Sequence, residues 1–408
     1  MEATQPLREE AVAARTRRPR CILRLAVVLP IFVGMCGTAP GHADNDWKVE
    51  ELLSRFAYFN QSGFGYQSQA GPGPKGSEDL HVWNPALYIR ARQNEKVEHT
   101  MVLPVDIITS ASTDAIDVVT SASRTNETIT LDITTRYEAT SDDMTSFRYG
   151  LHLEEWYRSV FAGFGYAREL AQDNATITMN VNGYVDVFRP YGPFGGLQPP
   201  GNERDTRGAL NANLEVSQIL SRTTLVKAGY GVTWQAGELI TPWNSVPIAC
   251  NPEVTVCLGR TQERFPNRRL RNAFSGFLAQ HIPATHSTLR LHYRFYFDNF
   301  DVQAHTMKVE LYQYATPRAY IRASYRAHHQ NSVYFWTRAV DLVDFDPTAP
   351  RTADSDLAEF WAHELGGKLV IYVDPTASVH RVDFGFSRYW RTNDLIVDVV
   401  SLGYARLF

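Results

Sequence analysis

The sequence predicts an all-β protein, a transmembrane antiparallel β-barrel of about sixteen strands, with fourteen to eighteen as the range. Three observations predict this fold. Long stretches alternate apolar and polar side chains, the connections between them alternate between short and long, and the last stretch ends on an aromatic residue, Phe408.

The clearest alternating stretch is residues 288–298. Its apolar face is Leu289, Leu291, Tyr293, Phe295 and Phe297. A two-residue period is that of a β-strand. Strands of soluble sandwiches usually have about five or six residues, whereas a tilted strand needs about nine to eleven to cross a bilayer. The length therefore favours strands that span a membrane.

The N-terminus has the features of an export signal. Four arginines (Arg15, Arg17, Arg18 and Arg20) precede the apolar run 25–35, and Gly41-His42-Ala43 forms a small-residue cleavage site. We expect residues 1–43 to be a cleaved signal peptide and residues 44–408 to be a single barrel domain. The mature chain has 34 basic and 41 acidic residues, a net charge of −7, which argues against a nucleic-acid partner.

The alternation places sixteen strands near residues 50–60, 80–92, 97–107, 127–137, 145–154, 158–168, 175–188, 208–220, 223–236, 271–281, 287–298, 303–315, 319–329, 358–373, 379–390 and 395–408. Every even-numbered connection is short. The long ones are all odd-numbered: 61–79, 108–126, 189–207, 237–270 and 330–357. Outer-membrane barrels have short periplasmic turns and long outer loops, so both termini are expected in the periplasm.

The C-terminal stretch resembles the terminal signal of bacterial outer-membrane barrels. Val400, Leu402, Tyr404 and Phe408 alternate, although Arg406 stands where an apolar residue is usual. We therefore expect outer-membrane lipid and the barrel-assembly machinery as partners. The aromatic residues expected at the membrane interface are Tyr293, Phe295, Phe297, Trp336, Trp361 and Trp390.

Two cysteines remain in the mature chain, Cys250 and Cys257. An exported protein meets oxidising conditions, so a disulfide that closes a small outer loop is expected, with two unpaired thiols as the alternative. No further Cys or His lies at metal-ligand spacing, and neither a metal nor a cofactor is expected.

A heptad of the form Asp-Φ-Φ-Thr-Ser-Ala-Ser, where Φ is Val or Ile, occurs twice, beginning at Asp106 and Asp117. Both copies fall in the outer connection between the third and fourth strands. The hydroxyl side chains suit a hairpin that satisfies its own backbone. In the alternative, this loop folds inward and the two carboxylates bind a cation or a solute.

The polar faces of three consecutive strands predict a basic lumen wall. Its candidate binding residues are Arg290, His292, Arg294, Asp298, Lys308, Glu310, Arg322, Arg326 and His328. Acidic residues at other inward positions are Glu98, Asp106, Glu154 and Asp383. A network of salt bridges that holds the barrel's shape would have the same composition. The functional interpretation is a channel or binding protein for small polar or anionic solutes.

Two alternatives remain open. One is a structural or surface-partner barrel without transport. The other is an outer-membrane hydrolase in which Asp298, His305 and His328 converge at the outer rim on a water or a metal ion. His305 has the opposite parity from its inward neighbours unless the strand carries a bulge. No catalytic motif of known spacing occurs in the mature chain, and we do not expect an enzyme.

Several stretches resemble one family of bacterial outer-membrane barrels, catalogued as domain of unknown function 3570. They are DIITSAS with DVVTSAS, LEEWYRS at 153–159, TRGALNANLEVSQILSRTTL at 206–225, ERFPNRRLRNAFSG at 263–276, YRFYFDNFDVQAHT at 293–306, YRAHHQNSVYF at 325–335 and TADSDLAEF at 352–360. The resemblance implies an outer-membrane location and brings no established activity.

Overall fold

The structure is a computed structural model that describes residues 47–63, 80–103, 128–154, 157–189, 205–240, 245–250, 257–343, 345–374 and 379–408. The expected signal peptide and the repeated motif with Asp106 and Asp117 lie outside these residues.

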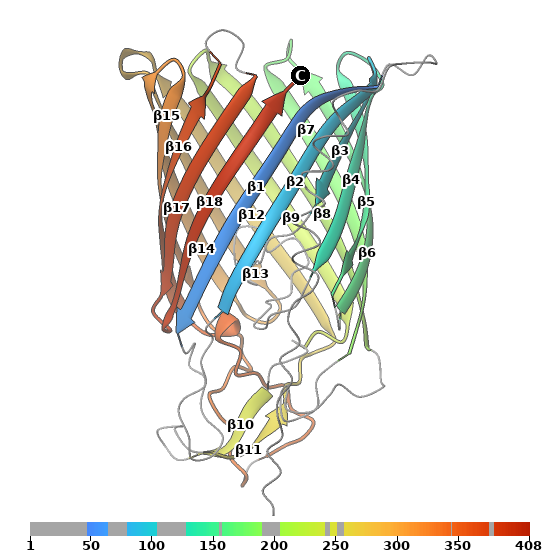
Figure 1. Cartoon of the computed structure of the whole chain (residues 1–408). Helices are drawn as coiled ribbons and strands as arrows, with labels where there is room; N and C mark the ends of the chain where they lie inside the picture. The colour runs from blue at the N-terminus through green and yellow to red at the C-terminus, as the bar shows by residue number, and fades with distance from the viewer. Residues whose placement is uncertain are drawn as a thin grey trace, which may run out of the picture. The chain divides into compact units, whose positions relative to one another are not determined.

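Sixteen strands form one closed antiparallel barrel (Figure 1). They are β1 (Lys48–Gly63), β2 (Leu80–Asn94), β3 (Val97–Leu103), β4 (Ile129–Glu138), β5 (Asp143–Leu153), β6 (Tyr157–Leu170), β7 (Ala175–Phe188), β8 (Asp205–Ser221), β9 (Thr224–Gly237), β12 (Arg268–Ile282), β13 (Ser287–Asp298), β14 (Gln303–Thr316), β15 (Ala319–Gln330), β16 (Phe360–Tyr372), β17 (His380–Arg391) and β18 (Leu395–Leu407). Each of the sixteen expected segments corresponds to one of these strands, so the predicted fold and strand count are confirmed.

Each barrel strand pairs with its neighbour in the chain except at one place. The outer loop after β9 contains a separate hairpin, β10 (Ser245–Cys250) with β11 (Cys257–Gln262), and β9 therefore pairs with β12. β18 pairs with β1 and closes the barrel. Closure leaves no open sheet edge, which a membrane-spanning sheet requires because lipid cannot hydrogen-bond to backbone groups.

The two ends of the barrel differ as the alternation of connection lengths predicted. The short turns lie at the end that also holds the C-terminus, and the β10–β11 hairpin belongs to the opposite end (Figure 1). We call the end with short turns the periplasmic end and the other the outer end, after the rule for such barrels.

Neighbouring side chains on each strand face opposite ways. On β13, Tyr293 is 49% exposed, whereas Tyr296, three positions further, is 1% exposed. Most exposed side chains on the outward face of the barrel are apolar, among them Phe164, Leu214, Leu365 and Phe384. Such a face is stable against hydrocarbon rather than water, so the barrel is a transmembrane one.

Helical structure is confined, within the described ranges, to the two 3-10 turns Pro283–Thr285 and Ser355–Leu357. No described helix has the length and apolar character needed to cross a membrane.

A small apolar core lies at the outer end, inside the barrel wall. Loop residues Leu239, Phe300, Val302, Val333, Phe335 and Leu357 pack against the inward side chains of Ala273, Tyr296 and Ala304. Trp336 packs against this core, and its indole N–H donates to the backbone carbonyl of Asp354 over 3.0 Å. Its assignment to the membrane interface was therefore wrong, because the loop that carries it turns toward the lumen instead of lipid.

Candidate functional site

All nine candidate binding residues lie on inward positions of β13, β14 and β15. The register shows this directly, because Arg290 is opposite Glu310, and Lys308 is opposite Arg326. Residues opposite one another in a sheet share a face. The structure thus brings the predicted lumen wall together, as the alternation requires.

Glu310 is the acidic centre of this wall. It is 5% exposed, and its carboxylate lies 2.9 Å from Lys308 Nζ, 3.8 Å from Arg322 Nη1 and 3.5 Å from His292 Nε2. One carboxylate therefore faces two permanent cations and an imidazole, and the wall keeps an excess of positive charge around it.

Other basic residues of the wall contact neighbouring side chains. The Arg290 guanidinium lies 4.4 Å from the centre of the Tyr312 ring and donates to its hydroxyl over 3.1 Å. Arg326 lies 3.7 Å from the Glu364 carboxylate. Aromatic stacking and single ion pairs fix these groups along the wall.

The expected acidic partners elsewhere in the lumen also face basic groups. Glu98 lies 2.8 Å from Arg136, Asp383 lies 2.6 Å from Lys368, and Glu154 lies 3.8 Å from His152. These contacts correspond to the structural network that the sequence offered as an alternative. The acids are locally paired, while the inner wall of β12–β16 carries more basic than acidic residues.

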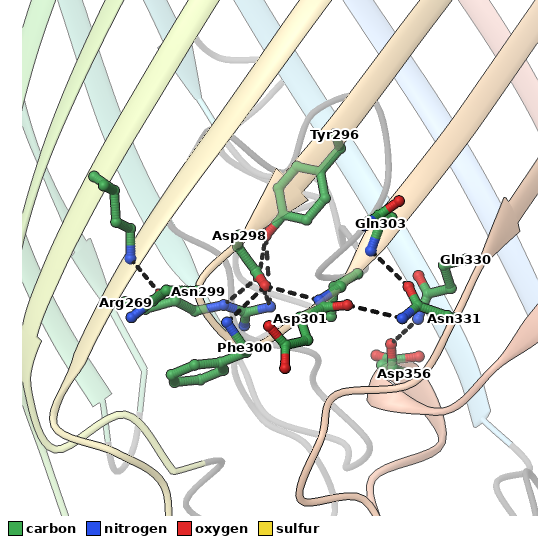
Figure 2. A network of polar contacts seen from close by, with 12 residues as sticks. Arg269, Tyr296, Asp298, Asn299, Phe300, Asp301, Gln303, Gln330, Asn331 and Asp356 are labelled. Atoms are coloured by element: carbon green, nitrogen blue, oxygen red, sulfur yellow. Dashed lines mark hydrogen bonds and ion pairs between the residues drawn. The ribbon is translucent and has the colours of Figure 1, made fainter.

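Asp298 serves the architecture of the outer mouth (Figure 2). Its Oδ2 atom accepts hydrogen bonds from Arg269 Nε at 2.8 Å and from the Tyr296 hydroxyl at 2.6 Å. Its Oδ1 atom accepts from the backbone N–H groups of Phe300 and Val302 at 2.9 and 3.0 Å. The carboxylate therefore fixes the loop between β13 and β14, and its lone pairs are already used by the protein.

The same arrangement of Arg, Asp and Tyr occurs three times at the outer end. Besides Arg269–Asp298–Tyr296, the sets are Arg207–Asp186–Tyr157 and Arg391–Asp356–Tyr389. Each arginine also lies over a phenylalanine ring, with centroid distances of 5.7 Å to Phe188, 4.6 Å to Phe300 and 4.5 Å to Phe360. We call these the Arg–Asp–Tyr clusters. Buried charges persist only when paired and hydrogen-bonded, so the clusters fix the rim of the mouth.

The sequence alone did not predict that these residues would form clusters. The signal present was an arginine on an inward position at the outer end of a strand, as at Arg207, Arg269 and Arg391. Their aspartates come from other strands or, for Asp356, from a loop. Only the register and the loop path place them together.

The three residues considered for a hydrolase site at the rim do not come together in the structure. His328 is buried, and its ring contacts Thr306 and Gln330. His305 lies opposite Phe295 on the outward face and bonds to the exposed Tyr293 hydroxyl over 2.7 Å. The alternative in which His305 converges with Asp298 is therefore contradicted, because no bulge reverses the parity of His305. In the described part of the chain, no group of three or more His, Cys, Asp and Glu residues is arranged to hold a metal ion.

A cavity of about 310 Å³ opens on the inner wall of β7, β8, β9 and β12. Its polar lining includes Thr178, Asn180, Asn213 and Ser275, together with one acidic residue, Glu215, and one basic residue, Arg294. Gly229 contributes because a side chain there would meet Ser275 Oγ at 2.6 Å. Amides, hydroxyls and one guanidinium can hydrogen-bond to a small polar solute, and the Glu215 carboxylate adds an acceptor to the same lining.

Glu238 stands in the outer loop directly after β9. Burial raises the pKa of its carboxyl above the usual value, although the N–H of Ile240 donates to the carboxylate over 3.3 Å. The outer mouth thus holds an acidic group that gains a proton more readily than an exposed glutamate.

Cys250 and Cys257 lie opposite each other in the register of the β10–β11 hairpin, and Cys257 is 4% exposed. This placement suits the expected disulfide, which requires closely opposed backbones.

Comparison with known proteins identifies one family and several solved structures of similar fold. The BenF-like porin from Pseudomonas fluorescens Pf-5 is 9% identical, with coverage of 89% of this chain and 99% of that one and a TM-score of 0.43. OpdK with vanillate from Pseudomonas aeruginosa has the same values. OccK2 (OpdF) in complex with glucuronate, from the same organism, is 8% identical, with coverage of 89% and 97% and a TM-score of 0.44.

No curated protein sequence matches. The family model described as Protein of unknown function (DUF3570) matches residues 121–401. This match covers more than half of the chain and includes most of the stretches that suggested the resemblance. The chain therefore belongs to the DUF3570 family.

Proposed function

We propose that the protein is an outer-membrane channel whose lumen binds and passes small anionic solutes. The observation that carries this proposal is the charge of the inner wall over β12–β16, all of whose residues the structure describes. Its inward basic residues number eight: Arg269, Arg271, Arg290, Arg294, Lys308, Arg322, Arg326 and Lys368. Its inward acidic residues number three: Asp298, Glu310 and Glu364.

The inner wall of β7, β8 and β9 has no such excess, since Arg207 pairs with Asp186 and Lys227 with Glu215, and Asp205 adds a further acidic residue. A wall of one sign beside low-dielectric protein concentrates ions of the opposite sign. Anions would therefore enter from either end and move along the basic side.

The remaining features are part of the same proposal. Residues 1–43 direct export, the short turns lie in the periplasm, and Phe408 presents the terminal strand to the barrel-assembly machinery. A Cys250–Cys257 disulfide closes the β10–β11 hairpin. Asp298 and His305, which motivated a hydrolase, lie on opposite faces of the barrel wall.

The test is the ion selectivity of the purified protein in planar bilayers under a KCl gradient. The wild type is expected to prefer chloride. Replacing Arg290, Arg294, Arg322 and Arg326 together by Gln should lower the chloride-to-potassium permeability ratio roughly severalfold, because the removed charges are those that concentrate anions.

The matched control replaces three outward arginines by Gln: Arg158, Arg268 and Arg406. These side chains are exposed on the lipid side or the rim, so selectivity should stay at the wild-type value. Absence of conductance in both the wild type and the fourfold variant would refute the open channel.

A further inference from the structure

The cavity on the inner wall of β7, β8, β9 and β12 has a floor of small residues. Gly229 and Gly231 of β9 lie opposite Ser275 and Ala273 of β12 in the register, and all four line the cavity. They occupy two successive inward positions on each strand. Glycine inside a strand often marks a place where another molecule approaches the backbone closely. We call this part of the cavity the small-residue recess.

Charged residues of opposite sign line the recess on its two sides. Glu215 of β8 lies opposite Gly229, and Arg294 of β13 lies opposite Ser275. Because Gly229 and Ser275 are themselves opposite each other, the four residues form one row across four neighbouring strands. Strands about 4.8 Å apart place the backbones of the acid and the base roughly 14 Å apart. The side chains of Gly229 and Ser275 are too short to fill that interval.

The Glu215 carboxylate is open to the lumen. Its side chain is 46% exposed, and its Oε1 atom accepts a hydrogen bond from Lys227 Nζ over 2.9 Å. In the part of the chain that the structure describes, Glu215 has no second polar partner. The Lys227 side chain is itself 37% exposed. An ion pair between two exposed groups contributes about 0–1 kcal/mol, so the carboxylate can still bind a cation from solution.

Arg294 provides the positive side of the recess. It is 6% exposed and lines the cavity, and its guanidinium lies 5.5 Å from the centre of the Tyr296 ring. Packing against that ring holds the long side chain along the wall. The guanidinium geometry matches a carboxylate, and the exposed Ser275 hydroxyl beside it is a further donor.

Neutral polar side chains complete the acidic side. Thr178 of β7 lies opposite Glu215, and Asn180 lies opposite Asn213. All of them line the same cavity. Hydroxyl and amide oxygens accept hydrogen bonds from an ammonium group. The β7–β8 side of the recess therefore offers acceptors and a negative charge, whereas the β13 side offers a positive charge.

We propose that the small-residue recess binds a small zwitterion, with its ammonium group at Glu215 and its carboxylate at Arg294, as in a free amino acid. A simple anion would meet the like charge of Glu215, and a simple cation that of Arg294; both contacts are unfavourable. A solute that carries both charges satisfies both sides. The site goes beyond the proposed passage of anions and rests on that proposal only for the water-filled lumen.

The test compares three solutes of similar size by saturation-transfer difference NMR titration against the detergent-solubilised full-length mature protein. L-alanine carries both charges, propionate only the carboxylate and ethylamine only the ammonium group. L-alanine is expected to bind about tenfold more tightly than either analogue, since each analogue loses one set of charge-assisted hydrogen bonds.

Glu215→Gln separates the two halves of the site. This variant should bind L-alanine about tenfold more weakly than the wild type, because the partner of the ammonium group is lost. It should bind propionate at least as tightly as the wild type does, a contrast that misfolding does not imitate. The matched control is Asp132→Asn on β4, a lumen carboxylate paired with Arg148 as Glu215 is with Lys227. Its affinity for L-alanine should stay at the wild-type value.

Three results would each overturn the proposal. They are the absence of L-alanine binding, equal affinity of the wild type for L-alanine and propionate, and wild-type affinity of E215Q for L-alanine. Because binding is measured in detergent without transport, any of them refutes the zwitterion site and leaves the chloride preference to the bilayer measurement.

Discussion

Replacing Asp298 by Asn is expected to lower the free energy of unfolding by about 3–5 kcal/mol, the usual loss when one partner of a buried ion pair is removed. Arg269 is 4% exposed and would remain charged without its carboxylate. The neutral amide also accepts the Phe300 and Val302 N–H groups less strongly. Urea unfolding in lipid vesicles, followed by tryptophan fluorescence, measures the loss.

Asp301→Asn in the same loop is the control for this substitution. Asp301 is exposed and has a φ of 65°, a conformation that Asn tolerates well. Its stability should change by less than about 0.5 kcal/mol. Protease cleavage within residues 299–302 should rise in D298N alone. Equal stability of D298N and the wild type would show that the Arg–Asp–Tyr cluster does not hold the mouth.

Replacing Phe386 by Arg should destabilise the folded barrel in lipid vesicles by about 2–4 kcal/mol, the cost of an arginine at the midplane of a lipid-facing surface. Phe386 is 47% exposed and lies near the middle of β17. The fraction of folded protein at increasing urea concentration, read from the gel mobility of unheated samples, measures the effect.

Ser387→Arg places the same side chain on the next residue, which faces the lumen opposite Val399. An arginine there reaches water or the inner carboxylates, so its effect should stay well below that of F386R. If both variants lost the same stability, the two faces of β17 would not differ in environment.

The alternation of side chains made the barrel readable from the sequence. Residues 288–298 show why: a period of two has only one register that keeps Arg290 and Asp298 away from lipid. Strand ends were less exact, and β8 begins at Asp205 instead of residue 208, because the rim meets both water and lipid and imposes no strict pattern.

The loops could not be predicted in this way. The contact of Asp356 with Arg391, or of Gln330 with the backbone carbonyl of Ala358, depends on where a long loop turns. Trp336 was misplaced for the same reason, since an aromatic residue suits a membrane interface and a loop core equally well. His305 shows the reverse case. The strict alternation of its strand places it on the outward face, although its chemistry had suggested a site at the rim.

The central claim is that lipid contacts the outer face of the barrel and water fills its lumen. The most direct test uses the neighbouring residues Ile321 and Arg322 on β15. A membrane-impermeant thiol reagent is applied to Ile321→Cys and Arg322→Cys proteins in lipid vesicles, with the wild type as background. Arg322→Cys should react on the order of tenfold faster, because a thiolate forms in water and not in hydrocarbon. Equal rates, or faster reaction of Ile321→Cys, would contradict a barrel whose basic wall lines an aqueous lumen.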